Sequence, residues 1–292
     1  MLIMKVFNNK NKFQLFCQSL QKKGSVGFVP TMGCLHEGHL SLIKNSLKTC
    51  KYTVVSIFVN PLQFGKNEDL NKYPHPLEND LKLCHELRCT AVFIPDNAHF
   101  YSPDFSIKIE ETSLSKVFCG QFRPGHFSGV ITVVTKLLNC TNPDILFLGQ
   151  KDYQQCLIIK RLIHNLDFNV KVKICKTSRE KSGLALSSRN QYLSTQDKSN
   201  ASLIYQAMKT VALQYKQKKP AKKEAITNQN INLFNKKLNK HLNNIKEFKL
   251  QYADIVCADS LGKLQPSSKK AVILVAGFFK KTRLIDNLIF NL

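Results

Sequence analysis

The sequence lacks several patterns that would assign it to a familiar class of protein. Its 292 residues contain no run of about 18 apolar residues, so we expect no membrane span. Met1 to Phe7 lacks the long apolar region of a secretory signal, and the ten cysteines include no Cys-x-x-Cys. These absences predict a cytoplasmic protein with reduced thiols. No G-x-G-x-x-G follows a predicted strand, which argues against a dinucleotide site of that type.

Acidic residues are also scarce, since 20 Asp and Glu face 43 Lys and Arg and give a formal net charge of +23. Such an excess favours anionic partners, nucleic acid among them. The charge is spread along the chain, and its densest run, Lys216 to Lys223, is predicted to be an exposed connection between helices. We interpret it as a solvated surface and expect no nucleic-acid partner. A basic nucleic-acid-binding module is the non-enzyme alternative.

Apolar runs alternate with helical patterns through the first 175 residues or so. The predicted strands are Val26–Val29, Thr53–Val59, Ala91–Ile94, Ile145–Leu148 and Val170–Ile174. The predicted helices are Leu40–Leu47, Glu78–Leu87, Phe127–Leu138 and Tyr153–His164. Short apolar strands separated by helices are typical of a Rossmann-like α/β fold, a parallel sheet with helices on both faces. Ligands of such sheets bind at the carboxyl ends of the strands.

The pattern changes near the polar stretch Thr177–Arg189. Predicted helices over Thr195–Lys216 and Ile231–Ile245 follow, and then three predicted strands over Tyr252–Val256, Ala271–Ala276 and Thr282–Ile289. This arrangement indicates a second, smaller α+β domain. We therefore expect one domain over residues 1–180 and another over residues 181–292.

The segment Pro30 to His39 joins a predicted buried strand to a predicted helix. The start of a helix attracts phosphate, and imidazoles three residues apart can both donate to it. His36 and His39 therefore indicate a nucleotide phosphate site, with a purely structural pair as the alternative. Zinc would need a fourth ligand beside Cys34, His36 and His39, so we expect no metal site.

Two further segments offer polar groups next to predicted elements. Pro61 is expected to end the strand Thr53–Val59 and to leave the amides of Asn60 and Gln63 at its rim. Such amides suit a hydroxy-acid substrate. Arg123, before the helix Phe127–Leu138, suits an anion. A loop cap and an ordinary helix start are the alternatives.

Two more segments carry charge or hydroxyl groups suited to phosphate. Lys151 follows the strand Ile145–Leu148 and supplies a mobile positive charge, and Asp152 suits a helix cap, Mg²⁺ or a ribose hydroxyl. Ser187 and Ser188 stand beside Arg189, a combination that suits a closing phosphate clamp. Taken alone, each segment also fits a helix cap or a surface loop.

Taken in order, these motifs resemble the pantothenate synthetase (pantoate–β-alanine ligase) family of the HxGH nucleotidyltransferase superfamily. The matching segments are Pro30–Gly33, His36–His39, Ser56–Pro61, Arg123–Phe127, Gly149–Asp152, Gln154–Gln155, Leu186–Asn190 and Arg283–Asn287. They extend over nearly the whole chain. The resemblance implies a Rossmann-like domain that binds ATP and pantoate, a C-terminal lid domain and a homodimer.

The resemblance also implies a reaction in two steps. The carboxylate of pantoate attacks the α-phosphorus of ATP, supplied with Mg²⁺, and gives pantoyl adenylate and pyrophosphate. The amine of β-alanine then displaces AMP and gives pantothenate. A related nucleotidyltransferase acting on another small acid is the alternative.

Site residues follow from the resemblance in the same way. It implies that ATP is bound by Met32, Gly33, Cys34, Leu35, His36, Glu37, Gly38, His39, Gly149, Gln150, Lys151, Asp152, Ser178, Leu186, Ser187, Ser188 and Arg189. The catalytic set would be His39 as proton donor with His36, Lys151, Ser188 and Arg189. Gln63 and Gln155 would bind pantoate, and Gln63 would also meet β-alanine.

Three positions depart from the family pattern. Cys119 stands where a Glu often precedes Gly120, and Ser182 stands where an Asp is common before Gly183. Ser178 replaces an apolar residue, although a backbone contact there would survive. We expect these changes to affect loop rigidity or rate and to leave the class of reaction unchanged.

Overall fold

The computed structural model describes residues 3–66, 68–96, 100–217 and 228–292. Two compact units divide the chain. The first comprises Met1–Gln150 and Gln155–Lys176, and the second comprises Lys151–Gln154 and Thr177–Leu292. The short stretch Lys151–Gln154 therefore belongs with the C-terminal part of the chain. The basic run Lys216 to Lys223 lies, from residue 218 on, outside the described residues.

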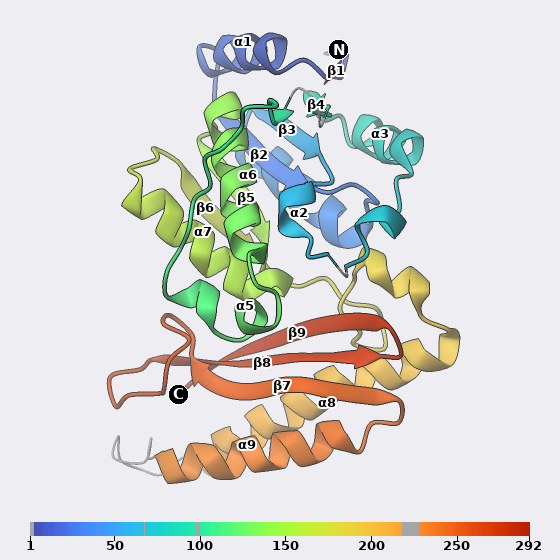
Figure 1. The fold of residues 1–292 in the computed structure, drawn as a ribbon, viewed down its shortest axis with the longest axis vertical. Coiled ribbons are helices and arrows are strands. Elements are labelled where there is room, and N and C mark those ends of the chain that lie inside the picture. Colours follow the sequence, from blue (N-terminus) through green and yellow to red (C-terminus); the bar gives the residue numbers. More distant parts are fainter. Residues whose placement is uncertain (1–2, 67, 97–99, 218–227) are drawn as a thin grey trace. The chain divides into compact units, whose positions relative to one another are not determined.

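A six-stranded sheet forms the centre of the first unit (Figure 1). Its order is β1-β4-β3-β2-β5-β6, and all neighbouring strands are parallel. The bounds are β1 Lys5–Phe7, β2 Val26–Thr31, β3 Tyr52–Ile57, β4 Ala91–Phe93, β5 Ile145–Gly149 and β6 Lys171–Cys175. The predicted parallel sheet is confirmed, and the continuous apolar runs of its four inner strands reflect burial on both faces.

Helices cover both faces of this sheet. They are α1 Lys10–Gln21, α2 Glu37–Thr49, α3 Leu77–Glu86, α6 His126–Thr141 and α7 Tyr153–Asn165, and the short helix α5 Cys119–Phe122 precedes α6. Successive residues of a strand point to opposite faces. On β4, Val92 joins a cluster with α2 and α3, whereas Phe93 stacks on Phe13 of α1 with ring centroids 4.2 Å apart. The prediction of helices on both faces is thereby confirmed.

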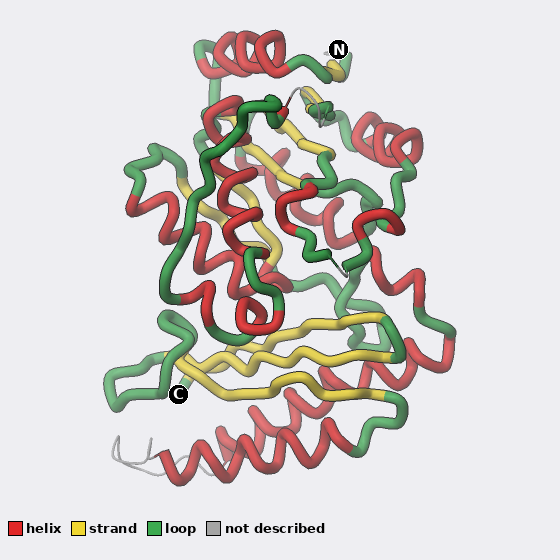
Figure 2. The backbone as a smooth tube through the Cα atoms, in the orientation of Figure 1, coloured by secondary structure: helices red, strands yellow, loops and turns green. Residues whose placement is uncertain are grey.

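The order in which strands are added to the sheet reverses at β2, since β3 and β4 follow on one side of it and β5 and β6 on the other. β2 has β3 on one side and β5 on the other, as the yellow strands of Figure 2 show. Ligands of open α/β sheets bind outside the carboxyl ends of the strands at such a reversal. The segment Met32–His39 follows β2, the 3-10 helix η1 (Pro61–Gln63) follows β3, and Gly149 ends β5. Three of the predicted motifs therefore lie along this edge.

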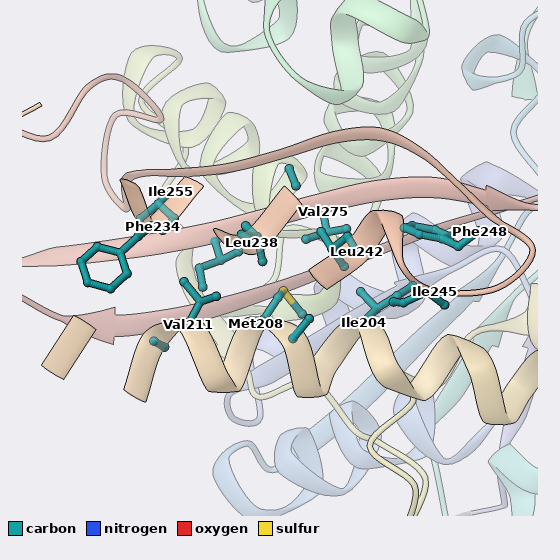
Figure 3. Packing of buried hydrophobic residues seen from close by; sticks show 14 of the residues in the cluster. Ile204, Met208, Val211, Phe234, Leu238, Leu242, Ile245, Phe248, Ile255 and Val275 are labelled. Atoms are coloured by element: carbon teal, nitrogen blue, oxygen red, sulfur yellow. The ribbon is translucent and has the colours of Figure 1, made fainter. Parts of the chain in front are cut away.

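The second unit is a three-stranded antiparallel sheet with helices on one face. The strands are β7 Phe248–Cys257, β8 Lys270–Phe279 and β9 Thr282–Asn291, in the order β7-β8-β9. The helices are α8 Thr195–Gln217 and α9 Asn228–Asn243. Figure 3 shows their apolar side chains interleaved with those of the sheet, among them Met208, Leu238 and Val275. The predicted α+β character of this region is confirmed.

Short 3-10 helices complete the chain. They are η2 Leu70–Lys72, η3 Leu114–Lys116, η4 Gln150–Asp152 and η5 Ser188–Tyr192, in addition to η1. Within the described ranges, no helix combines the length and the apolar character that a membrane span requires.

Candidate active site

The turn after β2 is held by a buried carboxylate from another part of the first unit. Gly33 and Cys34 both have positive φ, +81° and +50°. This conformation directs the backbone N–H groups of Cys34 and Leu35 to the two carboxylate oxygens of Asp80, each at 2.7 Å. Burial raises the pKa of Asp80, and the two N–H groups oppose that rise. Asp80 is 1% exposed and lies on α3, and no sequence motif singles it out.

Two imidazoles cap the start of α2. The Nδ1 atom of His36 accepts from the N–H of Gly38 at 3.1 Å, and the Nδ1 atom of His39 accepts from the N–H of His36 at 3.4 Å. The rings lie side by side with centroids 4.1 Å apart. Because Nδ1 is an acceptor in both, the neutral rings carry their proton on Nε2. Each histidine therefore presents an Nε2–H donor, while its other nitrogen holds the turn.

The remaining residues of this turn have different surroundings. Met32 is half-buried, and its sulfur accepts from the Nε2 atom of Gln63 at 2.8 Å. Glu37 is exposed and lies 3.5 Å from Lys44 on the same helix. The structure thus brings Met32 and Gln63 together, two residues predicted to bind different substrates.

Asn60 lies before, and Gln63 lies in, a short helix beyond the carboxyl end of β3. β3 ends at Ile57, and Asn60 is buried as the N-cap of η1, where its Oδ1 accepts from the N–H of Leu62 at 3.3 Å. Its Nδ2 donates to Gln63 Oε1 at 3.1 Å. The loop-cap alternative therefore holds for Asn60, because Pro61 starts a 3-10 helix whose first turn needs a cap.

Gly129 of α6 allows η1 to approach closely. A Cβ atom there would lie 2.1 Å from the carbonyl oxygen of Leu62 and 2.6 Å from the nitrogen of Gln63. The carbonyl of Gly129 also accepts from Asn60 Nδ2 at 3.0 Å. The position of Gln63 thus depends on a glycine that belongs to none of the sequence motifs.

Arg123 belongs to an internal ion pair. Its Nε and Nη2 atoms donate to the carboxylate of Glu68 at 2.6 and 2.5 Å. Burial alone would raise the pKa of Glu68, but the hydrogen bonds and charge of Arg123 outweigh it and hold that pKa below its ordinary value. His126 lies 2.9 Å from Arg123 Nη1 and donates from Nδ1 to the carbonyl of Gln63 at 2.8 Å. These contacts favour a structural role for Arg123 over binding of an anion.

The segment after β5 is divided between the two units. Gly149, Gln150 and the half-buried Gln155 belong to the first unit, whereas Lys151 and Asp152 belong to the second. The Nζ atom of Lys151 lies 3.5 Å from a carboxylate oxygen of Asp152.

Within the second unit, residues 178–192 form a small hairpin followed by η5. Leu186 N–H donates to the carbonyl of Ser178 at 3.0 Å, and an isolated bridge pairs Arg179 with Ala185. The turn contains Gly183 at φ +98°, and the hydroxyl of Ser182 accepts from Leu184 N–H at 3.4 Å. A serine thus takes the turn-closing role that an aspartate commonly has.

The hairpin leads directly into the predicted clamp. Ser187 is the N-cap of η5 and accepts from the N–H of Arg189 at 3.3 Å. Ser188 is buried, and Arg189 is half-buried. The segment predicted as a clamp or surface loop is therefore locally ordered by its own backbone.

A parallel sheet with two histidines capping the helix that starts where the strand order reverses is the arrangement expected of a protein that binds a nucleotide phosphate. The model of the family described as pantoate–β-alanine ligase matches residues 5–289. The chain is 41% identical to the pantothenate synthetase of Pseudothermotoga lettingae over 288 residues, 99% of each chain. The chain belongs to the pantoate–β-alanine ligase family.

Solved structures agree with this assignment. The pantothenate synthetase of Thermus thermophilus superposes with a TM-score of 0.89 at 36% identity and covers 98% of this chain and 99% of its own. The pantoate–β-alanine ligase of Francisella tularensis, complexed with β-γ ATP and β-alanine, gives a TM-score of 0.76 at 36% identity, with 98% and 97% covered. The predicted class of enzyme, an ATP-dependent ligase that forms pantothenate from pantoate and β-alanine, is confirmed.

Proposed function

We propose that residues of both units bind ATP and that the reaction passes through pantoyl adenylate. A carboxylate oxygen of pantoate attacks the α-phosphorus, the bond to the bridging oxygen of pyrophosphate breaks, and pyrophosphate leaves. The amine of β-alanine then attacks the acyl carbon, loses a proton, and AMP leaves. The relative from Francisella tularensis, complexed with β-γ ATP and β-alanine, supports ATP and β-alanine as substrates.

The observation that carries the proposal is the pair of histidine caps. Nδ1 of both His36 and His39 is engaged with the backbone, so each ring offers Nε2–H to an anion. Donors held in place before the reaction stabilise charge that develops on phosphate oxygens. His39 donates a proton or hydrogen bond to the phosphate chain, and His36 assists it. The amides of Cys34 and Leu35 are bonded to Asp80, so the imidazoles are the donors through which this turn acts.

The second unit supplies positive charge and hydroxyl groups. Lys151 and Arg189 neutralise charge on the leaving pyrophosphate, and Ser188 donates a hydrogen bond to it. Mg²⁺ bound with ATP would neutralise further charge on the phosphates. The half-exposed carboxylate of Asp152 fits it, because Mg²⁺ is typically held by one or two carboxylates together with phosphate oxygens.

Gln63 and Gln155 are the proposed pantoate ligands. Gln63 is held by Asn60 and contacts Met32 of the turn, which supports a hydroxy-acid site beside the nucleotide turn. A carboxamide both donates and accepts, as a hydroxy acid requires. Gln63 also meets β-alanine in this proposal.

Two measurements test the proposal: the ratio of AMP to pantothenate in the complete reaction, and pyrophosphate exchange when β-alanine is omitted. Purified protein given ATP, pantoate and β-alanine is expected to release AMP in proportion to pantothenate. With β-alanine omitted, labelled pyrophosphate is expected to exchange into ATP only when pantoate is present. Release of AMP without pantothenate, or exchange that does not depend on pantoate, would contradict the adenylate route.

We further propose that residues 1–180 and 181–292 act as the nucleotide domain and the lid, and that the protein is a cytoplasmic homodimer. All ten cysteines are free thiols and nine are buried, which supports a reducing compartment. Light scattering on the purified protein tests the dimer, since a mass near that of one 33.3 kDa chain would contradict it.

A further inference from the structure

Two adjacent residues of β9 are directed to opposite faces of the second unit's sheet. Asp286 pairs in register with Val275, a residue of the cluster that packs against α8 and α9, so Asp286 lies on the helix-covered face. Asn287 pairs with Leu274 and lies on the other face. β9 is also an edge strand, so its outer backbone is accessible to a neighbouring segment.

Asp286 anchors the hairpin that leads to the clamp. Its carboxylate accepts from both terminal nitrogens of Arg179, at 2.6 and 2.8 Å. The same guanidinium donates to the carbonyl of Gly183 at 3.0 Å, across the turn of the hairpin, and lies 3.7 Å from the ring centroid of Tyr205 on α8. One buried carboxylate therefore fixes both sides of the hairpin through a single arginine.

Asn287 anchors the segment that carries Lys151. Its Nδ2 atom donates to the carbonyl oxygen of Lys151 at 2.9 Å, and Asn287 is 1% exposed. Its own N–H donates to Asp286 Oδ1 at 2.7 Å, and its carbonyl accepts from Arg179 Nη2 at 3.3 Å. The two anchors thus form one hydrogen-bonded network, although the segments they hold are far apart in the sequence.

We propose that Asp286 and Asn287 are positioning residues that hold Lys151 and the segment Leu186–Arg189 in a fixed relation, so that both act on the phosphates of ATP as one set of donors. The proposal rests on the proposed role of Lys151, Ser188 and Arg189. Fixing donors before the reaction lowers the cost of ordering them in the transition state. Asn287 then acts on adenylation through Lys151 and does not touch substrate.

The test is Asn287→Ala with a matched control, Asn235→Ala. Asn235 joins α9 to β7 through hydrogen bonds to Asp254 and Ile255 in the same unit, at 2.6 and 3.0 Å, and supports neither segment. We expect Asn287→Ala to slow pantoate-dependent pyrophosphate exchange about 10- to 100-fold. A chase of preformed enzyme-bound pantoyl adenylate with β-alanine is expected to change less than about 2-fold, because that step no longer involves pyrophosphate. Asn235→Ala is expected to lower the melting temperature without separating the two half-reactions.

Two further measurements separate positioning from a loss of folding. Hydrogen exchange is expected to increase in the peptide covering residues 149–155 of Asn287→Ala and to stay unchanged there in Asn235→Ala. In a Lys151→Ala background, Asn287→Ala is expected to add less than about 2-fold to the loss of exchange activity, since the side chain that it positions is absent. If Asn287→Ala does not fold, Asn287→Ser takes its place, because serine is too short to reach the carbonyl of Lys151.

The outcomes are distinguishable. An equal loss of rate in both half-reactions would overturn the positioning role. So would a double variant whose loss of exchange activity equals the product of the losses in Asn287→Ala and Lys151→Ala. Normal exchange activity in Lys151→Ala itself would instead overturn the proposed function of that lysine. Asp286→Asn is a second test, for which we expect faster hydrogen exchange in residues 178–189 and slower adenylation. Unchanged hydrogen exchange in these residues would contradict the role of Asp286 as an anchor of the hairpin.

Discussion

The histidine turn of the first unit and the clamp of the second unit are held in place by different means. The turn is fixed by neutral backbone donors: the N–H groups of Cys34 and Leu35 bind the carboxylate of Asp80. The hairpin before the clamp is fixed by a charged donor, the guanidinium of Arg179 on Asp286. In both, the residues that we propose to contact ATP stand together in the sequence, whereas the carboxylate that holds them comes from a distant element.

This difference determines which groups of each segment remain as proposed donors to phosphate. The backbone of the turn is occupied by Asp80 and by the histidine caps, so its proposed chemistry depends on two imidazole Nε2–H groups. In the second unit, the proposed donors are instead the ammonium group of Lys151 and the guanidinium group of Arg189. A proton can be exchanged with an imidazole at neutral pH but not with a guanidinium. The comparison therefore supports our proposal that the first unit donates the proton and that the second neutralises charge.

The largest expected effect on the rate of adenylation follows from removing a proposed phosphate donor from either unit. His39→Ala and Lys151→Ala are each expected to slow adenylate formation by ~10²-fold or more, as for other transition-state donors. Pantoate-dependent pyrophosphate exchange measures the effect. Lys160→Ala, an exposed lysine on α7, is the matched control and is expected to keep its activity. Exchange activity retained with both His39 and Lys151 changed would refute their roles.

The next largest effect is expected from removing Asp80, the carboxylate that holds the histidine turn. Asp80→Ala leaves the N–H groups of Cys34 and Leu35 without their acceptor, and each buried unsatisfied donor costs about 1–3 kcal/mol. We expect a loss of about 2–4 kcal/mol in the free energy of unfolding, measured by urea denaturation, together with slower adenylation. Asp80→Asn retains one acceptor and turns a donor toward the second N–H, so it is expected to fall between Asp80→Ala and the unchanged protein. A stability equal to that of the unchanged protein would show that the carboxylate does not hold the turn.

The sequence predicted the position of the histidine turn in the fold far better than the groups that support it. The strand before Met32 and the helix after His39 have strong patterns, so the turn was correctly placed between β2 and α2. Asp80 stands in an ordinary polar helix, and only the folded sheet brings it beside the turn. Burial of Asn60 likewise depended on Tyr101 and Gly129, which local sequence does not connect to it.

Elements that the sequence analysis did not predict show the same limit. α1 was not predicted, although its buried Phe13, Cys17 and Leu20 follow a helical spacing, because polar residues outnumber the apolar ones in this segment. The hairpin at residues 178–186 was not predicted either, since a single bridge and an arginine anchored 107 residues away create it. Long-range partners of this kind leave no local pattern.

A smaller effect is expected from the glycine beside Gln63. Gly129→Ala would place a methyl group 2.1 Å from the carbonyl oxygen of Leu62, and such overpacking typically costs about 1–3 kcal/mol. Because η1 must shift, we expect a several-fold higher KM for pantoate with a smaller change in KM for ATP. Gly65→Ala is the matched control, since a Cβ there meets atoms only at 3.7 Å or beyond. Equal changes in both KM values would contradict a role of Gly129 in placing Gln63.

The smallest effect is a difference in how acid acts on Glu68 and Asp80, two carboxylates of the first unit. The folded pKa of Glu68 lies below its unfolded value near 4.3, because Arg123 outweighs the effect of burial. Its contribution to stability is therefore fully present above the unfolded pKa and is lost as the pH falls through the lowered folded pKa. The folded pKa of Asp80 is raised, so protonation of Asp80 begins at higher pH and favours the folded state.

Glu68→Gln is expected to flatten the decline of the melting temperature below about pH 4.5, because it removes a carboxylate whose protonation destabilises the fold. Asp80→Asn is expected to steepen that decline, because it removes a carboxylate whose protonation favours the fold. The same slope in both variants would show that the two carboxylates respond alike and that Arg123 does not set the pKa of Glu68.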